Sequence, residues 1–186
     1  RDSWDIYKAS IIRKEEPYFY ASTVLKEEPL IATAKDEYQP KLSPDGKEIA
    51  YVEERNTLKV YNIATKKTVT LLPEGHNYSY SDGDWDFNWS PDSKWIITDD
   101  EMGYFSSSNT ALIAADGTGK IVYPVNSGFG EFNGKWALGG KMLTWESSKL
   151  GRKSLASQGS QEVDVYGVFF DKDAFDQFIL SKEDYA

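Results

Sequence analysis

Residues 39–52 read QPKLSPDGKEIAYV, the pattern of two strands joined by a tight turn. Leu42 ends the first strand, and Ile49 begins the alternating apolar pattern of the second. Pro44 presets its own φ for the turn, and Gly46 takes the positive-φ position that a residue with a Cβ resists. Taken alone, this segment predicts only a hairpin.

The hairpin recurs twice at a constant spacing of 47 residues (90 − 43 and 137 − 90). The turn SPDGK at 43–47 is followed by SPDSK at 90–94 and ALGGK at 137–141. Two apolar columns keep the same step, and their members are Leu42, Trp89 and Trp136, and Ile49, Ile96 and Leu143. A period of this length built from short strands is typical of β-propeller blades. We therefore predict an all-β fold in which both columns are buried between stacked four-stranded sheets.

The period divides the chain into four units of one propeller segment. These are 1–35, the outer strands of a partial blade; 36–82 and 83–130, two complete blades; and 131–186, an incomplete blade with an exit tail. The expected architecture is a partial β-propeller of about three four-stranded blades plus the outer strands of a preceding blade. A length of 186 residues suits one domain with a substantial core.

The two ends of the chain depart from the repeat. We expect strands at 4–11, 18–25 and 30–33, with the segment 26–29 breaking the last two apart. In the tail, the apolar residues at positions 174, 175, 178 and 179 share one helical face, which predicts a short helix or turn.

Composition excludes several classes of function. The net charge of −9, from 30 acidic and 21 basic residues, repels a phosphate backbone and makes nucleic acid an unsuitable partner. The chain has no cysteine, so it forms no disulfide and has no thiol nucleophile or cysteine-based metal site. No apolar run approaches the roughly 18 residues of a membrane helix, and we expect no membrane span.

One stretch resembles the start of a calcium loop, Asp82-Gly83-Asp84-Trp85-Asp86. Such a loop needs Gly at its sixth position and Glu at its twelfth, where this chain has Phe87 and Ser93. The stretch therefore predicts a turn rather than a metal site. His76, the only histidine, lies in the long polar link 74–83, and we interpret it as a solvated loop residue.

The remaining candidates for chemistry have simpler interpretations. The serines at 106–108, 154, 157 and 160 lie in no G-x-S-x-G elbow, and nucleophilic catalysis needs a base beside the serine. The tryptophans at 89, 136 and 145 fall in or beside predicted strands, which favours core packing. The sequence therefore predicts no catalytic, cofactor-binding or metal-binding residue.

The segments 42–51 and 89–97 resemble the PD40 repeats of TolB-type and tricorn-type propellers. More specifically, 4–7, 16–20 and 164–184 are similar to the propeller region of bacterial tricorn-like proteases of the S41 peptidase family. In that family the propeller is non-catalytic and guides peptides toward a serine protease domain later in the polypeptide. No position here matches the nucleophilic serine or its partners.

The resemblance implies that this chain is not itself an enzyme but an excised piece of a larger one, which agrees with its start at Arg1 rather than Met. Its implied partners are peptide or protein substrates and the catalytic half of the parent protease, in a periplasmic or otherwise extracytoplasmic location. Two alternatives remain open: a TolB-like interaction module of the cell envelope, and the propeller of an S9 prolyl-oligopeptidase-type peptidase. Because an opened ring exposes strand edges and apolar sheet faces, we also expect self-association.

Overall fold

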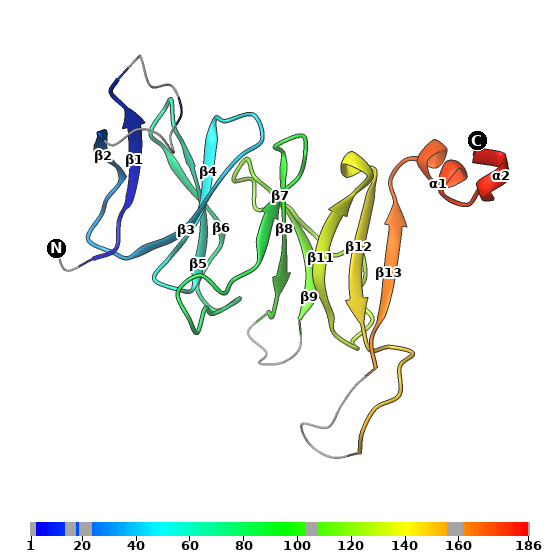
Figure 1. The fold of residues 1–186 in the computed structure, drawn as a ribbon. Helices are drawn as coiled ribbons and strands as arrows, with labels where there is room; N and C mark the ends of the chain where they lie inside the picture. Colours follow the sequence, from blue (N-terminus) through cyan, green and yellow to red (C-terminus); the bar gives the residue numbers. More distant parts are fainter. Residues whose placement is uncertain (1–2, 14–17, 19–23, 103–107, 156–161, 186) are drawn as a thin grey trace.

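The computed structural model describes residues 3–13, 18, 24–102, 108–155 and 162–185. These residues form four antiparallel sheets that follow one another in chain order from the N-terminus to the C-terminus (Figure 1). The fold is all-β and corresponds to a partial β-propeller, as the 47-residue period predicts. The division into units at 36, 83 and 131 stays a prediction.

The first four-stranded sheet has the strand order β3-β4-β5-β6, so each strand pairs with the next one in the chain. Its strands are β3 (Glu37–Leu42), β4 (Glu48–Glu53), β5 (Thr57–Asn62) and β6 (Thr68–Leu72). The turn between β3 and β4 closes when the Gly46 amide donates to the Ser43 carbonyl at 2.9 Å. Gly46 has a φ of 74°, the conformation for which the sequence predicts a glycine.

The second four-stranded sheet repeats this arrangement. Its strands are β7 (Phe87–Trp89), β8 (Trp95–Asp100), β9 (Asn109–Ala114) and β10 (Ile121–Val122). Ser93 stands where the previous turn has Gly46, and it holds the same positive φ, 62°. The turn geometry therefore persists although the residue has a Cβ.

The third sheet has three strands among the described residues, in the order β11-β12-β13. They are β11 (Glu131–Ala137), β12 (Met142–Ser147) and β13 (Asp164–Phe169). A single 3₁₀ turn, Leu138–Gly140, joins β11 to β12 in place of the SPD turn of the other sheets. Gly139 and Gly140 of this 3₁₀ turn line a cleft between the second and third sheets.

The N-terminal sheet has two strands, β1 (Ile6–Ile11) and β2 (Leu25–Ile31). The expected break at 26–29 is wrong, because these residues lie inside β2. Pro29 is tolerated there since it pairs with Tyr7 next to a register irregularity in a two-stranded sheet. Most of the expected strand at 18–25 lies outside the described residues.

Two short helices follow the last sheet, α1 (Lys172–Phe178) and α2 (Lys182–Tyr185). The first is the helix that the sequence predicts; it begins where the Asp171 carboxylate accepts the Ala174 amide at 2.8 Å. Its Phe175 and Phe178 rings pack on Phe169, with centroid distances of 5.3 and 5.2 Å. Neither helix has the length and apolarity that crossing a bilayer requires.

The core lies between adjacent sheets, and the two repeat columns explain how it forms. Members of the columns are cross-strand partners, in the pairs Leu42 and Ile49, Trp89 and Ile96, and Trp136 and Leu143. Directly opposed residues of an antiparallel pair point to the same face, so each pair faces the preceding sheet. Ile96 and Leu143 are fully buried there.

The expectation that both columns are buried is wrong at Leu42, which is 59% exposed. The described part of the preceding sheet has only two strands, and their Ile6 and Ile31 pack against Ile49. Leu42 lies beyond these contacts. Burial of a repeat position thus depends on the neighbouring sheet as well as on the repeat itself.

Candidate functional site

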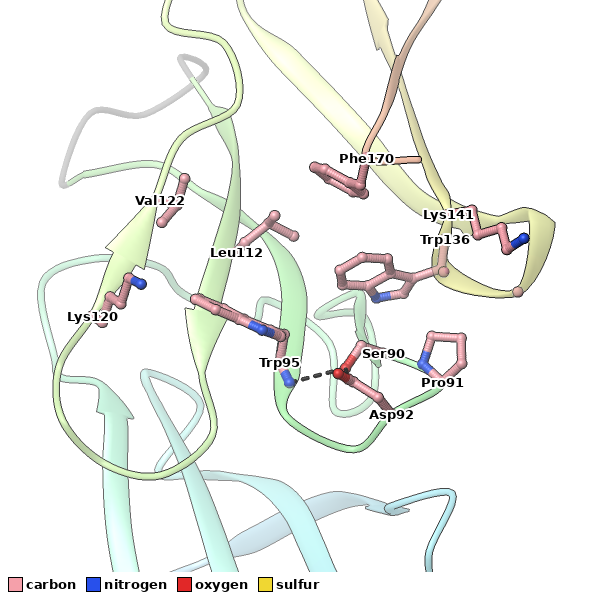
Figure 2. Close-up of a pocket in the computed structure, with 12 residues that line it drawn as sticks. Ser90, Pro91, Asp92, Trp95, Leu112, Lys120, Val122, Trp136, Lys141 and Phe170 are labelled. Carbon is pink, nitrogen blue, oxygen red and sulfur yellow. Dashed lines mark hydrogen bonds between the residues drawn. The ribbon is translucent and has the colours of Figure 1, made fainter. Parts of the chain in front are cut away.

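A cleft of about 500 Å³ lies between the second four-stranded sheet and the three-stranded sheet (Figure 2). The turn Ser90–Asp92 lines it on one side, and Trp136 and Phe170 line it on the other. Segments some 80 residues apart in the sequence (170 − 90) thus meet at this site.

Three aromatic rings line the cleft. Trp95 begins β8 and Trp136 lies on β11; both are half-buried, whereas Phe170 is 54% exposed. The Trp136 and Phe170 ring centroids are 6.3 Å apart. The Trp136 indole N–H is buried and has no hydrogen-bond partner among the described residues. Large amphipathic rings of this kind are typical of surfaces that hold a side chain of a ligand.

Two lysines and one aspartate supply the charges. The Lys120 ammonium lies over the Trp95 ring, 5.2 Å from its centroid, and Lys141 lines the opposite wall. The Asp92 carboxylate accepts the Ser90 hydroxyl at 2.6 Å, and this hydrogen bond is the main reason that the pKa of Asp92 lies below its usual value. The aspartate is therefore anionic and already hydrogen-bonded within its own turn.

The third repeat lacks the acid that accompanies the lysine in the other two. In those turns the lysine forms an ion pair with the aspartate two residues before it, Lys47 with Asp45 at 3.0 Å and Lys94 with Asp92 at 3.9 Å. Gly139 stands at the corresponding position before Lys141. Lys141 therefore has no carboxylate within its own turn.

The cleft is closed on the side of β7 and β11. A Cβ placed on Gly140 would lie 3.3 Å from Pro91 Cδ, so the two turns that follow these strands touch. Gly140 has a φ of 92°, which also favours glycine at this position. Val122 and Phe170 line the cleft away from this contact (Figure 2).

The geometry suits binding rather than nucleophilic catalysis. Ser90, the serine of the cleft, is 3% exposed; its hydroxyl donates to Asp92 and accepts the Trp95 amide at 2.9 Å. Both bonds hold the turn together. An activated nucleophile would need an adjacent base and access to substrate.

His76 is not the solvated loop residue that the sequence suggests. Its Nδ1 lies 3.1 Å from the carboxylate of Asp100, a fully buried residue at the end of β8. The Tyr123 hydroxyl donates to the same carboxylate at 2.7 Å, and burial, followed by this hydrogen bond, raises the pKa of Tyr123. The buried Asp100 carboxylate needs hydrogen-bond partners, and its bond to His76 holds the link 74–83 against the second sheet.

The stretch at 82–86 forms a turn, as expected. The Asp84 carboxylate accepts the Ser79 hydroxyl at 2.5 Å and the Ser81 amide at 2.9 Å, and Asp82 pairs with Arg55 at 2.8 Å. Of the serines considered as nucleophiles, Ser108 donates to the Glu131 carbonyl at 3.2 Å. The serines at 106, 107, 157 and 160 lie outside the described residues.

The cleft joins residues that sequence analysis either assigns to the core, as with Trp136, or gives no role, as with Lys120 and Phe170. One signal in the sequence points toward it. The turn SPD of the first two repeats becomes ALG at 137–139, so the third repeat departs from the pattern in the turn that borders the cleft. No feature of the sequence indicates that Lys120 and Phe170 line the cleft, because their place there depends on how the sheets stack.

Comparisons with known proteins agree with the propeller fold. No protein-family model matches the chain, and no curated protein matches it. The crystal structure of the tricorn protease superposes with a TM-score of 0.56 at 12% sequence identity, covering 77% of this chain and 14% of that one. A structure assigned as TolB from Agrobacterium tumefaciens gives a TM-score of 0.45 at 16% identity, covering 78% of this chain and 56% of that one. The chain thus spans only part of the length of either protein, and the likeness to tricorn supports a shared fold.

Proposed function

We propose that this chain is a non-catalytic propeller segment that binds peptides, as the substrate-handling part of a tricorn-like serine protease of the S41 family. The observation that carries the proposal is the cleft of Figure 2, where Trp95, Trp136 and Phe170 form an apolar hollow that is closed on one side. Such a hollow suits one apolar side chain of a peptide. The fold shared with tricorn supports the wider assignment.

We also propose partners and a location for the chain. The catalytic half of the parent protease is the macromolecular partner, and the location is periplasmic or otherwise extracytoplasmic. A second copy of the chain is a further partner, because the last sheet and the helix after it carry exposed apolar side chains. Val165 and Ile179 are 72% and 61% exposed there.

Peptide binding can be tested by calorimetry with capped peptides that contain a single phenylalanine. Val122 lines the cleft and is 38% exposed, so Val122→Asp places a charge on the cleft wall with little effect on the core. We expect binding to weaken by about tenfold or more, since an apolar ligand would have to desolvate the new carboxylate. Val163→Asp, at a valine that is 44% exposed and outside the cleft lining, is the matched control. Equal loss in both variants would refute the cleft as the binding site.

The absence of bond cleavage is tested separately. We expect no hydrolysis of any fluorogenic peptide by the purified chain, because Ser90 is buried and engaged in its own turn. Reproducible hydrolysis that survives further purification and is abolished by a serine-directed inhibitor would overturn the non-catalytic assignment.

A further inference from the structure

We propose that the cleft is selective for an acidic segment, one in which an apolar side chain is followed by an aspartate or glutamate. The rings of Trp95 and Trp136 hold the apolar side chain, and the Lys120 ammonium pairs with the carboxylate. This inference rests on the proposed function and adds the charge of the ligand to it.

Lys120 is held in place and is available to a ligand. Its carbonyl accepts the Ala114 amide at 2.9 Å, which fixes the end of the turn between β9 and β10. Its ammonium lies over Trp95 and, in the described part of the chain, forms no salt bridge within 4.0 Å. The acid of its own turn, Asp116, attracts Lys120 at longer range, but its carboxylate already accepts the Thr118 amide at 3.0 Å and the Thr118 hydroxyl at 2.7 Å. A carboxylate brought by a peptide would thus be the direct ionic partner of Lys120.

Lys141 adds a second positive charge to the cleft. The replacement of the turn aspartate by Gly139 removes the ion pair that Lys47 and Lys94 form in their turns. Asp92 is the one acid among the described residues that line the cleft, and its carboxylate is occupied by Ser90 and the Lys94 amide. The cleft is therefore a locally cationic site on a chain whose net charge is −9.

A cationic ligand fits this site poorly. Aromatic faces attract cations, but one face of Trp95 already carries the Lys120 ammonium. A cationic ligand would be repelled by this ammonium and by Lys141 as well. Charge complementarity thus favours a carboxylate.

The position of a neighbouring hollow indicates an internal acidic side chain rather than a chain end. This second hollow, of about 340 Å³, shares Trp95 and Lys120 with the cleft and is also lined by Lys94 and by two acids, Glu48 and Asp116. A peptide whose apolar side chain fills the cleft can therefore continue past Lys120 into the second hollow. A chain terminus would leave that hollow empty.

The test uses four N-acetylated peptides in a Gly-Ser background, measured by calorimetry at low salt. Three are amidated and contain Phe-Glu, Phe-Gln or Ala-Glu; the fourth ends in Phe with a free carboxylate. We expect Phe-Glu to bind about three- to fivefold more tightly than Phe-Gln, the size typical of a partly exposed ion pair, with the difference shrinking as salt is raised. Ala-Glu should bind more weakly than Phe-Glu, since the rings lose their ligand.

Substitutions at Lys120 and Gly139 test which residues cause the preference for Phe-Glu. Lys120→Gln should abolish the preference for Phe-Glu over Phe-Gln, and Lys120→Arg should keep it; Lys67→Gln, in the corresponding turn between β5 and β6, is the matched control. Gly139→Asp returns a carboxylate to the turn beside Lys141 and should weaken Phe-Glu binding relative to Gly139→Asn. Asp and Asn both tolerate the positive φ of 64° at this position, so the pair differs chiefly in charge.

Each outcome decides between the two proposals. Equal affinity of the wild-type chain for Phe-Glu and Phe-Gln would overturn the acidic preference and leave peptide binding intact. A preference that survives Lys120→Gln would overturn the role of Lys120, and tighter binding of the free-carboxylate peptide than of Phe-Glu would overturn the choice of an internal acid. Failure of all four peptides to bind would overturn the proposed function together with this inference.

Discussion

Glu131 occupies the same position in its sheet as Glu37 does two periods earlier (131 − 37 = 94 residues). Each opens the first strand of its sheet, and they are 1% and 3% exposed. Each accepts a hydrogen bond from a hydroxyl four residues upstream, Glu131 from Ser127 and Glu37 from Thr33. Among the described residues, the second carboxylate oxygen of both is buried without a partner. The first and third repeats therefore carry a buried acid that the apolar columns do not reveal, whereas the second has the exposed Asp84 at this position.

The buried acid predicts a pH dependence of stability. Burial is the main cause that raises the pKa of Glu37 above its ordinary value of 4.5. The folded state then binds the proton more tightly than the unfolded chain does. The contribution of Glu37 to the free energy of unfolding therefore falls as the pH rises from 4.5 through the folded pKa. Glu37→Gln removes the charge, and its free energy of unfolding relative to wild type should increase between pH 4.5 and 7 in urea titrations. The exposed Glu27→Gln is the control, and identical pH profiles of the two variants would contradict the assignment.

The SPD turn predicts a loss of stability in Ser90→Ala. The hydroxyl of Ser90 bonds both to Asp92 and to the Trp95 amide, and the residue is 3% exposed. Removing it leaves a buried amide without its acceptor, which costs about 1–3 kcal/mol of unfolding free energy. Chemical denaturation measures the loss, and Ser81→Ala, at an exposed serine of the link 74–83, should change the stability by less than about 0.5 kcal/mol. A loss at Ser90 no larger than that at Ser81 would refute the structural role.

The contact between the second and third sheets predicts that Gly134→Ala destabilises the fold. A Cβ at this glycine would lie 2.5 Å from Thr110 Cγ2 and 2.7 Å from Ile97 Cδ1, both in the core between the sheets. Overpacking of this kind costs about 1–3 kcal/mol. Ile97→Val removes one of the clashing atoms, so in a double-mutant cycle the two substitutions together should cost less than the sum of their separate effects. Strict additivity would show that the sheets separate rather than clash.

The exposed apolar end face predicts self-association through the last sheet. Val165 is 72% exposed on β13, and Val165→Lys should shift the protein toward the monomer in light scattering at micromolar concentration. Leu150→Lys, at a leucine that is 76% exposed in the loop after β12, is the control and should leave the association unchanged. A wild-type chain that is monomeric at this concentration would exclude the proposal.

The local part of this structure follows from the sequence. The turn at 43–46 needs only a proline, a hydrogen-bonding side chain and a residue that accepts positive φ, and these are adjacent in the chain. The pairing of Leu42 with Ile49 follows from that turn, because a tight turn sets the register of its two strands. The 47-residue period then repeats the hairpin and implies stacked sheets, since one sheet cannot bury its apolar face alone.

Tertiary structure decided which of these repeated positions are buried and which form a site. Leu42 is exposed because the described part of the preceding sheet has two strands, a fact that its own hairpin does not contain. His76 meets Asp100 and Trp136 meets Phe170 only after segments that are distant in the sequence fold together. Turns and registers depend on neighbours in the chain, whereas burial, charge pairing and the cleft depend on neighbours in space.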